Sequence, residues 1–220
     1  VMQLLKKQIK PRDIVTRKAL ENAATIVAAT GGSTNAGLHF TALENAAGIK
    51  FDLMDDAKIF TRTPYLADLK PGGKYVAKDM WEAGGVPMLL KTLYEGGYIH
   101  GECMTVTGKT MKENLRNIKF NVNQKVLREY NNPLSPDGGV VGLKGNLAPD
   151  GGIVKIAVLK KLQFTGKARC FDNEEDAMNA VQTKKYKDGD IIIIRYEGPK
   201  GGPGMREMLS TTGAIYGQGK

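Results

Sequence analysis

Apolar residues recur at helical spacing in the first part of the chain. Thr16 precedes one such stretch as a natural N-cap, and Gly31 with Gly32 follows it, so a helix is predicted between them. A second helix is predicted through "NAGLHFTALENAA", capped by Ser33 or Thr34 and ended at Gly48. The apolar stripe of the first helix consists of Ala19, Leu20, Ala23, Ala24, Ile26 and Val27.

The chain continues with short helical patterns separated by glycine pairs. Helices are predicted in "FDLMDDAKIFTRT", "YVAKDMWEAGG", "VPMLLKTLYEGG" and "KTMKENLRNI". The Pro/Gly-rich stretch "PYLADLKPGGKY" predicts a loop, and "HGECMTVTG" predicts a short strand with a turn.

The pattern changes from helical to strand-like after about residue 130. Turn-forming residues fill "NNPLSPDGGVVGLKGNLAPDGG", and strands are predicted in "GIVKIAVL", "KARCF" and "DIIIIRYEG". One helix, "NEEDAMNAVQTKK", is predicted to begin with a capping box from Asp172 to Glu175. The run Ile191 to Ile194 predicts a strand buried on both faces. We therefore expect a mostly helical domain over residues 1–130, and a linker with a β-rich domain over residues 131–220.

Composition narrows the class of protein. The 220 residues are 41% hydrophobic and carry a net charge of +9, but basic and acidic residues are interleaved, as in "KTMKENLRNIK". That mixture is typical of solvated helix faces, so no nucleic-acid partner is predicted. No apolar run approaches the roughly 20 residues of a membrane helix, so no membrane partner is predicted either. Two cysteines give no disulfide framework and indicate a reducing compartment.

Two glycine-rich loops could carry chemistry. "GGSTN", from Gly31 to Asn35, places hydroxyls and free amides at a helix N-terminus, where they could hold a carboxylate or a phosphate. The alternative is a helix C-cap followed by an N-cap. "YEGPKGGPGMREM", with charges including Lys200 and Arg206, could close over an anionic substrate or offer a carboxylate to a metal. A solvent loop with helix-capping charges is equally compatible with its composition.

Other motifs are too incomplete to define a site. "VTGKT" ends like a phosphate-binding P-loop, but Cys103 stands where that loop needs a glycine. His100 and Cys103 have a ligand-like spacing, although one such pair does not make a zinc site. Two cysteines cannot supply the ligands of an iron–sulfur cluster by themselves.

Eight blocks of the sequence, in order, resemble the dihydroxy-acid dehydratase and phosphogluconate dehydratase family. The resemblance runs essentially end to end and implies an interior fragment: the end of an N-terminal α/β domain followed by the start of a C-terminal β-barrel-like domain. The blocks are "PRDIVTRKALENA", "GGSTNAGLH", "LADLKPGGKYV", "GGVPMLLKTL", "HGECMTVTGKT", "GNLAPDGGIVK", "FDNEEDAMNAV" and "IIIIRYEGPKGGPGMREML".

The resemblance implies a hydro-lyase that converts 2,3-dihydroxy carboxylates to 2-keto acids in valine and isoleucine biosynthesis. An iron–sulfur cluster would act as Lewis acid, with Mg²⁺ beside it. The family's Cys-Asp-Lys motif would lie upstream and its "TDGRFSGG" stretch downstream. No catalytic residue and no iron–sulfur ligand is therefore expected in this chain, which alone would be inactive and hold neither cofactor tightly.

One functional residue carries over from the family: Glu207 in "PGMREM" matches its magnesium-ligand glutamate. The resemblance also implies a homodimer in the cytoplasm, or in an organelle matrix of a eukaryote. Two alternatives stay open: a sugar-acid dehydratase acting on 6-phosphogluconate or an aldonate, and a non-catalytic anion-binding module. The substrate-binding candidates are Ser33, Thr34, Asn35, Lys200 and Arg206.

Overall fold

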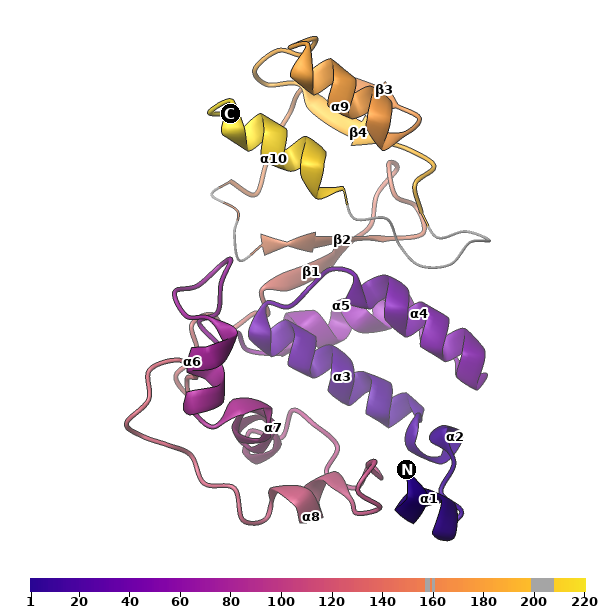
Figure 1. Ribbon diagram of the computed structural model, residues 1–220, viewed down its shortest axis with the longest axis vertical. Coiled ribbons are helices and arrows are strands. Elements are labelled where there is room, and N and C mark those ends of the chain that lie inside the picture. Colours follow the sequence, from indigo (N-terminus) through magenta and orange to yellow (C-terminus); the bar gives the residue numbers. More distant parts are fainter. Residues whose placement is uncertain (157–158, 160, 199–207) are drawn as a thin grey trace. The chain divides into compact units, whose positions relative to one another are not determined.

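The computed structural model describes residues 1–156, 159, 161–198 and 208–220. It mixes helices with a few short strands and divides into two compact units, Val1–Lys160 and Lys161–Lys220 (Figure 1).

The first unit is built mainly from helices. Its described strands form one antiparallel hairpin, β1 (Val140–Leu143) and β2 (Gly152–Lys155). The helices in chain order are α1 (Met2–Lys6), α2 (Pro11–Ile14), α3 (Arg17–Thr30), α4 (Ala36–Ala47), α5 (Leu53–Arg62), α6 (Ala77–Glu82), α7 (Gly85–Glu95) and α8 (Met111–Leu115).

Local capping explains where the principal helices begin and end. The Thr16 hydroxyl accepts a hydrogen bond from the Ala19 amide at 3.2 Å, which confirms the predicted start of α3. Gly31 and Gly48 end α3 and α4 with φ values of 56° and 70°, in the left-handed region that glycine adopts without strain. Asp52 accepts from the first amides of α5, so this helix too has its own start signal.

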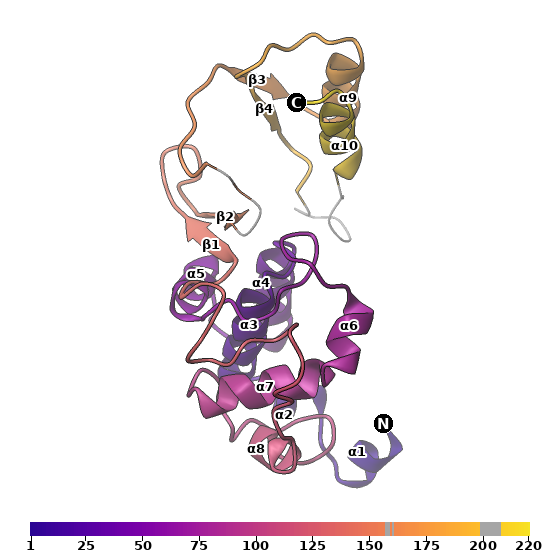
Figure 2. The ribbon, with the colours of Figure 1, turned by 90° about the vertical axis from the view of Figure 1, so that its left-hand side faces the viewer.

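One hydrophobic core lies between α3, α5 and the hairpin. Both ribbon views show α3, α4 and α5 side by side (Figures 1 and 2). Strand β1 packs on α5 so closely that a Cβ at Gly142 would come within 2.2 Å of the Ala57 side chain. The buried members of this core are Leu20, Ala24, Ala28, Phe40, Phe51, Ile59, Phe60 and Val140.

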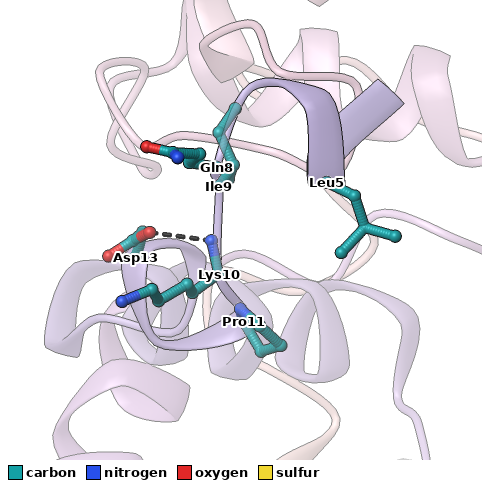
Figure 3. Close-up of a pocket in the computed structure, with 6 residues that line it drawn as sticks. All are labelled: Leu5, Gln8, Ile9, Lys10, Pro11 and Asp13. Carbon is teal, nitrogen blue, oxygen red and sulfur yellow. Dashed lines mark hydrogen bonds between the residues drawn. The ribbon is translucent and has the colours of Figure 1, made fainter. Parts of the chain in front are cut away.

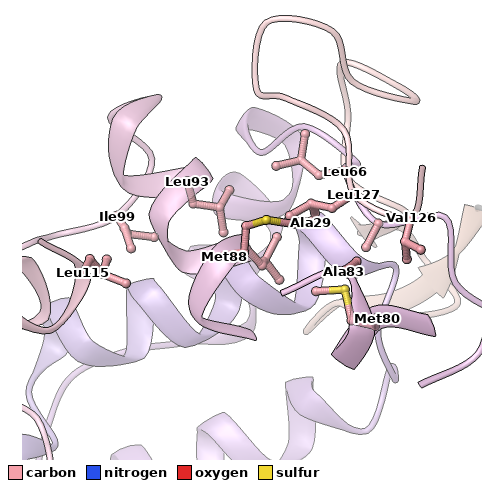
Figure 4. Close-up of a cluster of buried hydrophobic side chains, with 12 residues drawn as sticks. Ala29, Leu66, Met80, Ala83, Met88, Leu93, Ile99, Leu115, Val126 and Leu127 are labelled. Atoms are coloured by element: carbon pink, nitrogen blue, oxygen red, sulfur yellow. The ribbon is translucent and has the colours of Figure 1, made fainter. Parts of the chain in front are cut away.

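A second core of the same unit surrounds α7 (Figure 4). Helix α7 supplies Met88, Leu89 and Leu93, and further members come from α3, α6, α8 and the loop before α6. Residues 126–127 join this core through backbone pairing. The Arg128 amide donates to the Leu66 carbonyl at 2.9 Å, and the Tyr65 amide donates to the Ser135 carbonyl at 3.0 Å. Residues 126–135 are thereby fixed to the helical unit.

The compact units consequently divide after Lys160, whereas the sequence pattern predicted a domain change at residue 130. The hairpin strands follow the change of pattern, but Val140 is completely buried in the helical unit. A change in hydrophobic period marks where strands begin; it does not tell which core those strands join.

The second unit contains a β–α–β arrangement with a further helix. Strands β3 (Ala168–Phe171) and β4 (Ile191–Ile194) are parallel, with Ala168 opposite Ile191, and α9 (Glu174–Gln182) connects them. Helix α10 (Leu209–Gly217) lies against α9, and both contribute to its small core. The four isoleucines of β4 are half-buried, so the prediction of a strand buried on both faces was wrong.

Three local predictions need correction. "HGECMTVTG" forms no strand: only an isolated bridge joins Met104 to Thr110, because Thr105 and Lys109 close a tight turn between them. The helix that follows is limited to α8. The cap of α9 is Asn173, whose side chain accepts from the Asp176 amide at 2.7 Å, whereas Asp172 pairs with Arg195.

Candidate functional site

The "GGSTN" segment forms the turn between α3 and α4. Gly31 takes the left-handed conformation, and a Cβ there would lie 3.0 Å from the Tyr65 ring. The Gly32 amide donates to the Val27 carbonyl at 2.9 Å and closes the end of α3. The two glycines therefore reverse the chain and leave the next residues at the entrance of α4.

The start of α4 differs from the predicted one. The N-cap position is occupied by Asn35, not by Ser33 or Thr34. The Ser33 hydroxyl instead accepts from the Asn35 amide at 3.2 Å, and the Ser33 and Thr34 carbonyls accept from the Ala36 and Gly37 amides. The chain makes one tight turn before the helix proper, so the hydroxyl stabilises that leading turn.

A groove of about 420 Å³ opens beside this turn. It is lined by residues 30–34, residues 69–71 and Lys155, and we call it the lysine groove. Its described lining contains the charged residues Lys70 and Lys155 and no acidic residue. The structure thus places two of the predicted substrate-binding residues, Ser33 and Thr34, beside two cations.

Lys70 and Lys155 were not among the residues predicted from the sequence. Lys155 ends β2 and is half-buried, and this burial lowers the pKa of its ammonium group. A sequence signal for it exists, because Lys155 is the one charge within the apolar run "GGIVKIAV". Lys70 lies in an exposed Pro/Gly-rich loop, and its sequence context carries no comparable signal.

The second glycine-rich loop is mostly outside the described residues. Lys200, Arg206 and Glu207 all lie there. At its near edge, Glu197 accepts a hydrogen bond from the Glu174 amide at 2.8 Å, at the N-terminus of α9. Tyr196 has a φ of 62° and lies under the Arg195 guanidinium, 5.2 Å from ring centroid to Cζ.

The remaining motif residues have structural partners. His100 Nε2 lies 2.6 Å from a Glu21 carboxylate oxygen, and the Asn22 side chain bonds both backbone groups of His100. Cys103 is buried and unoxidised, and burial raises the pKa of its thiol. "VTGKT" forms a turn whose Thr110 caps α8 by accepting from the Glu113 amide. These contacts attach the 98–110 segment to α3 and α8.

Another groove, of about 570 Å³, lies at the N-terminal end of the first unit (Figure 3). Its single carboxylate, that of Asp13, accepts from the Lys10 amide at 2.7 Å and so serves to hold the entrance of α2. Across the described ranges, no three His, Cys, Asp or Glu side chains are grouped closely enough to hold a metal ion. The lysine groove is therefore the better candidate for a binding site.

Two family models match almost the whole chain. The N-terminal domain of the dihydroxy-acid/6-phosphogluconate dehydratases matches residues 1–114, and the C-terminal domain of the same family matches residues 125–220.

Individual relatives agree with these matches. A protein named dihydroxy-acid dehydratase from Pelagibacter ubique is 84% identical over 219 residues, which is 100% of this chain and 38% of that protein. Proteins with that name from Parvibaculum lavamentivorans and, as number 2, from Mesorhizobium japonicum are 66% and 63% identical across the whole chain. The chain spans 38% and 37% of their respective lengths. With one family's domains matched in order along it, the chain belongs to the dihydroxy-acid/6-phosphogluconate dehydratase family.

Proposed function

We propose that this chain is part of a hydro-lyase that removes water from a 2,3-dihydroxy carboxylate and yields a 2-keto acid. The observation that carries the proposal is the 84% identity, over the whole chain, to a protein named dihydroxy-acid dehydratase. The complete enzyme would serve valine and isoleucine biosynthesis in the cytoplasm, or in an organelle matrix of a eukaryote, as a homodimer. No helix in the described part of the chain is long and apolar enough to cross a membrane.

The lysine groove supports a role for this chain in holding the substrate. The reaction removes a proton from C2 and the hydroxyl from C3, and the resulting enol becomes the keto acid. Negative charge develops beside the carboxylate when the C2 proton leaves. Cations placed at that carboxylate lower the free energy of this step, because they act on the charge as it develops.

The proposal assigns the metal chemistry to other parts of the longer protein. Cys103 and Cys170 belong to different compact units, and the described residues do not supply the three or four ligands that a cluster needs. We propose that this chain alone holds neither an iron–sulfur cluster nor Mg²⁺ tightly. Iron and sulfide analysis after anaerobic reconstitution of the 220-residue chain tests this, since stoichiometric iron surviving desalting contradicts it.

Glu207 is proposed as a magnesium ligand in the complete enzyme, and Lys200 and Arg206 as groups facing the substrate. Support comes from the family resemblance of "PGMREM" and from the preference of magnesium for carboxylate ligands. The proposed domain assignment also follows the family: residues 1–130 end the N-terminal α/β domain, and residues 131–220 begin a β-barrel-like C-terminal domain.

A sugar-acid dehydratase of the same family is the second candidate. The family's name includes 6-phosphogluconate dehydratases, and two lysines in one groove can hold a phosphate as well as a carboxylate. The purified full-length protein should be given 2,3-dihydroxy-3-methylbutanoate and, separately, 6-phosphogluconate. Keto-acid formation from the first alone supports the proposal, and formation from the second alone overturns it in favour of the sugar acid.

A further inference from the structure

Lys155 lines the lysine groove, and no described acidic side chain is paired with it. It is half-buried, and its side chain makes no hydrogen bond or ion pair with any residue in the described ranges. Holding an ammonium group partly out of water costs free energy unless an anion accompanies it. An oxyanion entering the groove would restore the missing charge and hydrogen-bond partner.

Lys70 adds a second positive charge from a different part of the chain. It lines the same groove from the loop between α5 and α6 and is exposed to solvent. Among the described ion pairs none involves Lys70. Two ammonium groups facing one concavity repel each other, and a bound oxyanion turns that repulsion into attraction.

The turn before α4, which also lines the lysine groove, contains backbone donors. The Asn35, Ala36 and Gly37 amides are bonded to the Ser33 hydroxyl and to the Ser33 and Thr34 carbonyls. Within the described structure the amides of Ser33 and Thr34 themselves donate to no acceptor. These amides stand at the entrance of α4, where the helix dipole also favours an anion.

Packing holds β2 against the start of α4. The Ile153 side chain lies over Gly37, where a Cβ would come within 2.5 Å of its Cδ1, so a larger residue there would force that side chain to move. Lys155 is opposite Val140 in the hairpin, and Val140 is completely buried in the α3–α5 core. The backbone that carries Lys155 is therefore fixed by the core and not by a ligand.

We propose that the lysine groove binds the oxyanion group of a small substrate, a carboxylate or a phosphate. Lys155 and Lys70 are the cations, and the Ser33 and Thr34 amides are the donors. The inference deepens the proposed function and rests on it only for the identity of the substrate. A carboxylate and a phosphate both present a small oxyanion to the groove, and the experiment below distinguishes between them.

The full-length protein that contains this chain is labelled by reductive methylation, and each lysine is followed by peptide mass spectrometry. Sodium isobutyrate and inorganic phosphate are the two probes. Either probe, if bound in the groove, slows labelling of Lys155 and Lys70 and leaves Lys144 unchanged. Lys144 is the matched control, because it lies in the same hairpin segment, is exposed and is outside the groove.

The variants Lys155→Met, Lys70→Met and Lys155→Arg, with Lys144→Met as control, test the cations separately. Losing one charge-assisted hydrogen bond should weaken protection by the effective probe roughly tenfold. Lys155→Arg keeps the charge and should retain most of the protection of Lys70. Melting curves identify a variant that has not folded. If Lys155→Met fails to fold, Lys70→Met, on an exposed loop, still tests whether a cation of the groove binds the probe.

The possible outcomes test the oxyanion site and the proposed dehydratase function separately. Protection by isobutyrate alone assigns a carboxylate site, and protection by phosphate alone assigns a phosphate site. Protection by neither, or equal protection of Lys144, overturns the inference. If 2,3-dihydroxy-3-methylbutanoate is dehydrated and Lys155→Met leaves both its KM and the labelling unchanged, the inference fails while the proposed function stands. If no dehydration occurs and labelling is still suppressed, the function fails and the site stands.

Discussion

At the scale of single residues, Asp56 has the most unusual environment among the described carboxylates with a shifted pKa. It is buried in α5, and its Oδ1 has no hydrogen-bond partner within the described residues. Burial raises its pKa from 3.8 to about 7, and the neighbouring charges of Asp55 and Asp52 act in the same direction. Asp56 is therefore largely protonated in the folded protein at mildly acidic pH, and ionised in the unfolded chain.

Asp56 should make the free energy of unfolding depend on pH. The folded state binds the Asp56 proton more tightly than the unfolded chain does. The protonated carboxyl therefore adds its full stabilisation below about pH 4, and this stabilisation is lost as pH rises towards 7. We expect Asp56→Asn to remove this slope and to be more stable than the parent at pH 8. About three pKa units at about 1.4 kcal/mol each correspond to about 4 kcal/mol, and solvent screening reduces the expected gain to on the order of 2 kcal/mol. Urea unfolding from pH 4 to pH 8 measures it.

The exposed Asp150→Asn variant is the control for this experiment. It should keep the slope of the parent protein. A parent whose stability stays level from pH 4 to pH 7, or rises, would show that the Asp56 carboxylate finds a partner in solution.

Glu207 is the residue on which the magnesium proposal depends. In the full-length enzyme, Glu207→Gln should collapse turnover and weaken magnesium binding at least roughly tenfold, because a carboxamide is a poorer ligand than a carboxylate. A helix-capping role predicts instead a loss of roughly 0.3–1 kcal/mol of stability with activity kept. Activity titrated against magnesium distinguishes the two, and Glu129→Gln at an exposed position is the control.

At the scale of the elements, the turn before α4 separates two hydroxyls that look equivalent in the sequence. The Ser33 hydroxyl accepts from the Asn35 amide, whereas the Thr34 hydroxyl makes no hydrogen bond within the described residues. Ser33→Ala should therefore cost about 1 kcal/mol of stability, typical of a lost cap, and Thr34→Ala should cost less. Thermal unfolding of both variants checks this.

The same two variants also bear on substrate binding. A structural role predicts normal KM values for both, since neither substitution removes the backbone amides proposed as donors. A sharp rise in KM for Thr34→Ala would give its hydroxyl a direct contact with the substrate. Equal losses of stability in the two variants would contradict the assignment to Ser33 of the hydrogen bond that stabilises the turn before α4.

At the scale of the whole molecule, the chain should be cut first between its compact units. Residues 161–168 are exposed and contain Lys161 and Lys167, which trypsin recognises. Lys125 and Arg128 are also exposed, but Val126 and Leu127 between them are buried and paired with residues 66–68. We expect limited trypsin digestion to release a fragment beginning after Lys161 or Lys167. First cleavage within residues 119–140 would support a division near residue 130.

The two family models also divide the chain, but at a different place from the compact units. Matches over residues 1–114 and 125–220 leave a short connection between the two family domains, well before the division of the compact units. The β1–β2 hairpin accounts for this difference, because it follows the first match and still packs on α5. A segment assigned by sequence to the second domain thus completes the core of the first unit.

Local signals were sufficient for most helices of this chain. Thr16, Asp52 and the glycines at 31 and 48 act on the backbone within one turn, so their effect can be read from neighbouring residues. The family could also be identified from the order of its motifs. The prediction failed where two neighbouring side chains can both cap a helix, as Asp172 and Asn173 can at the start of α9.

The amino-acid sequence by itself determined most of the helices, the change to strands and the membership of a dehydratase family. Only the tertiary structure decided that Lys70 and Lys155 line one groove with Ser33 and Thr34, that Asp56 is buried, and that Val140 joins the helical core. The physical reason is the distance along the chain over which each interaction acts. Caps and hydrophobic periods act over a few residues, whereas a groove and its charge arise from segments that lie far apart in the chain until the core brings them together.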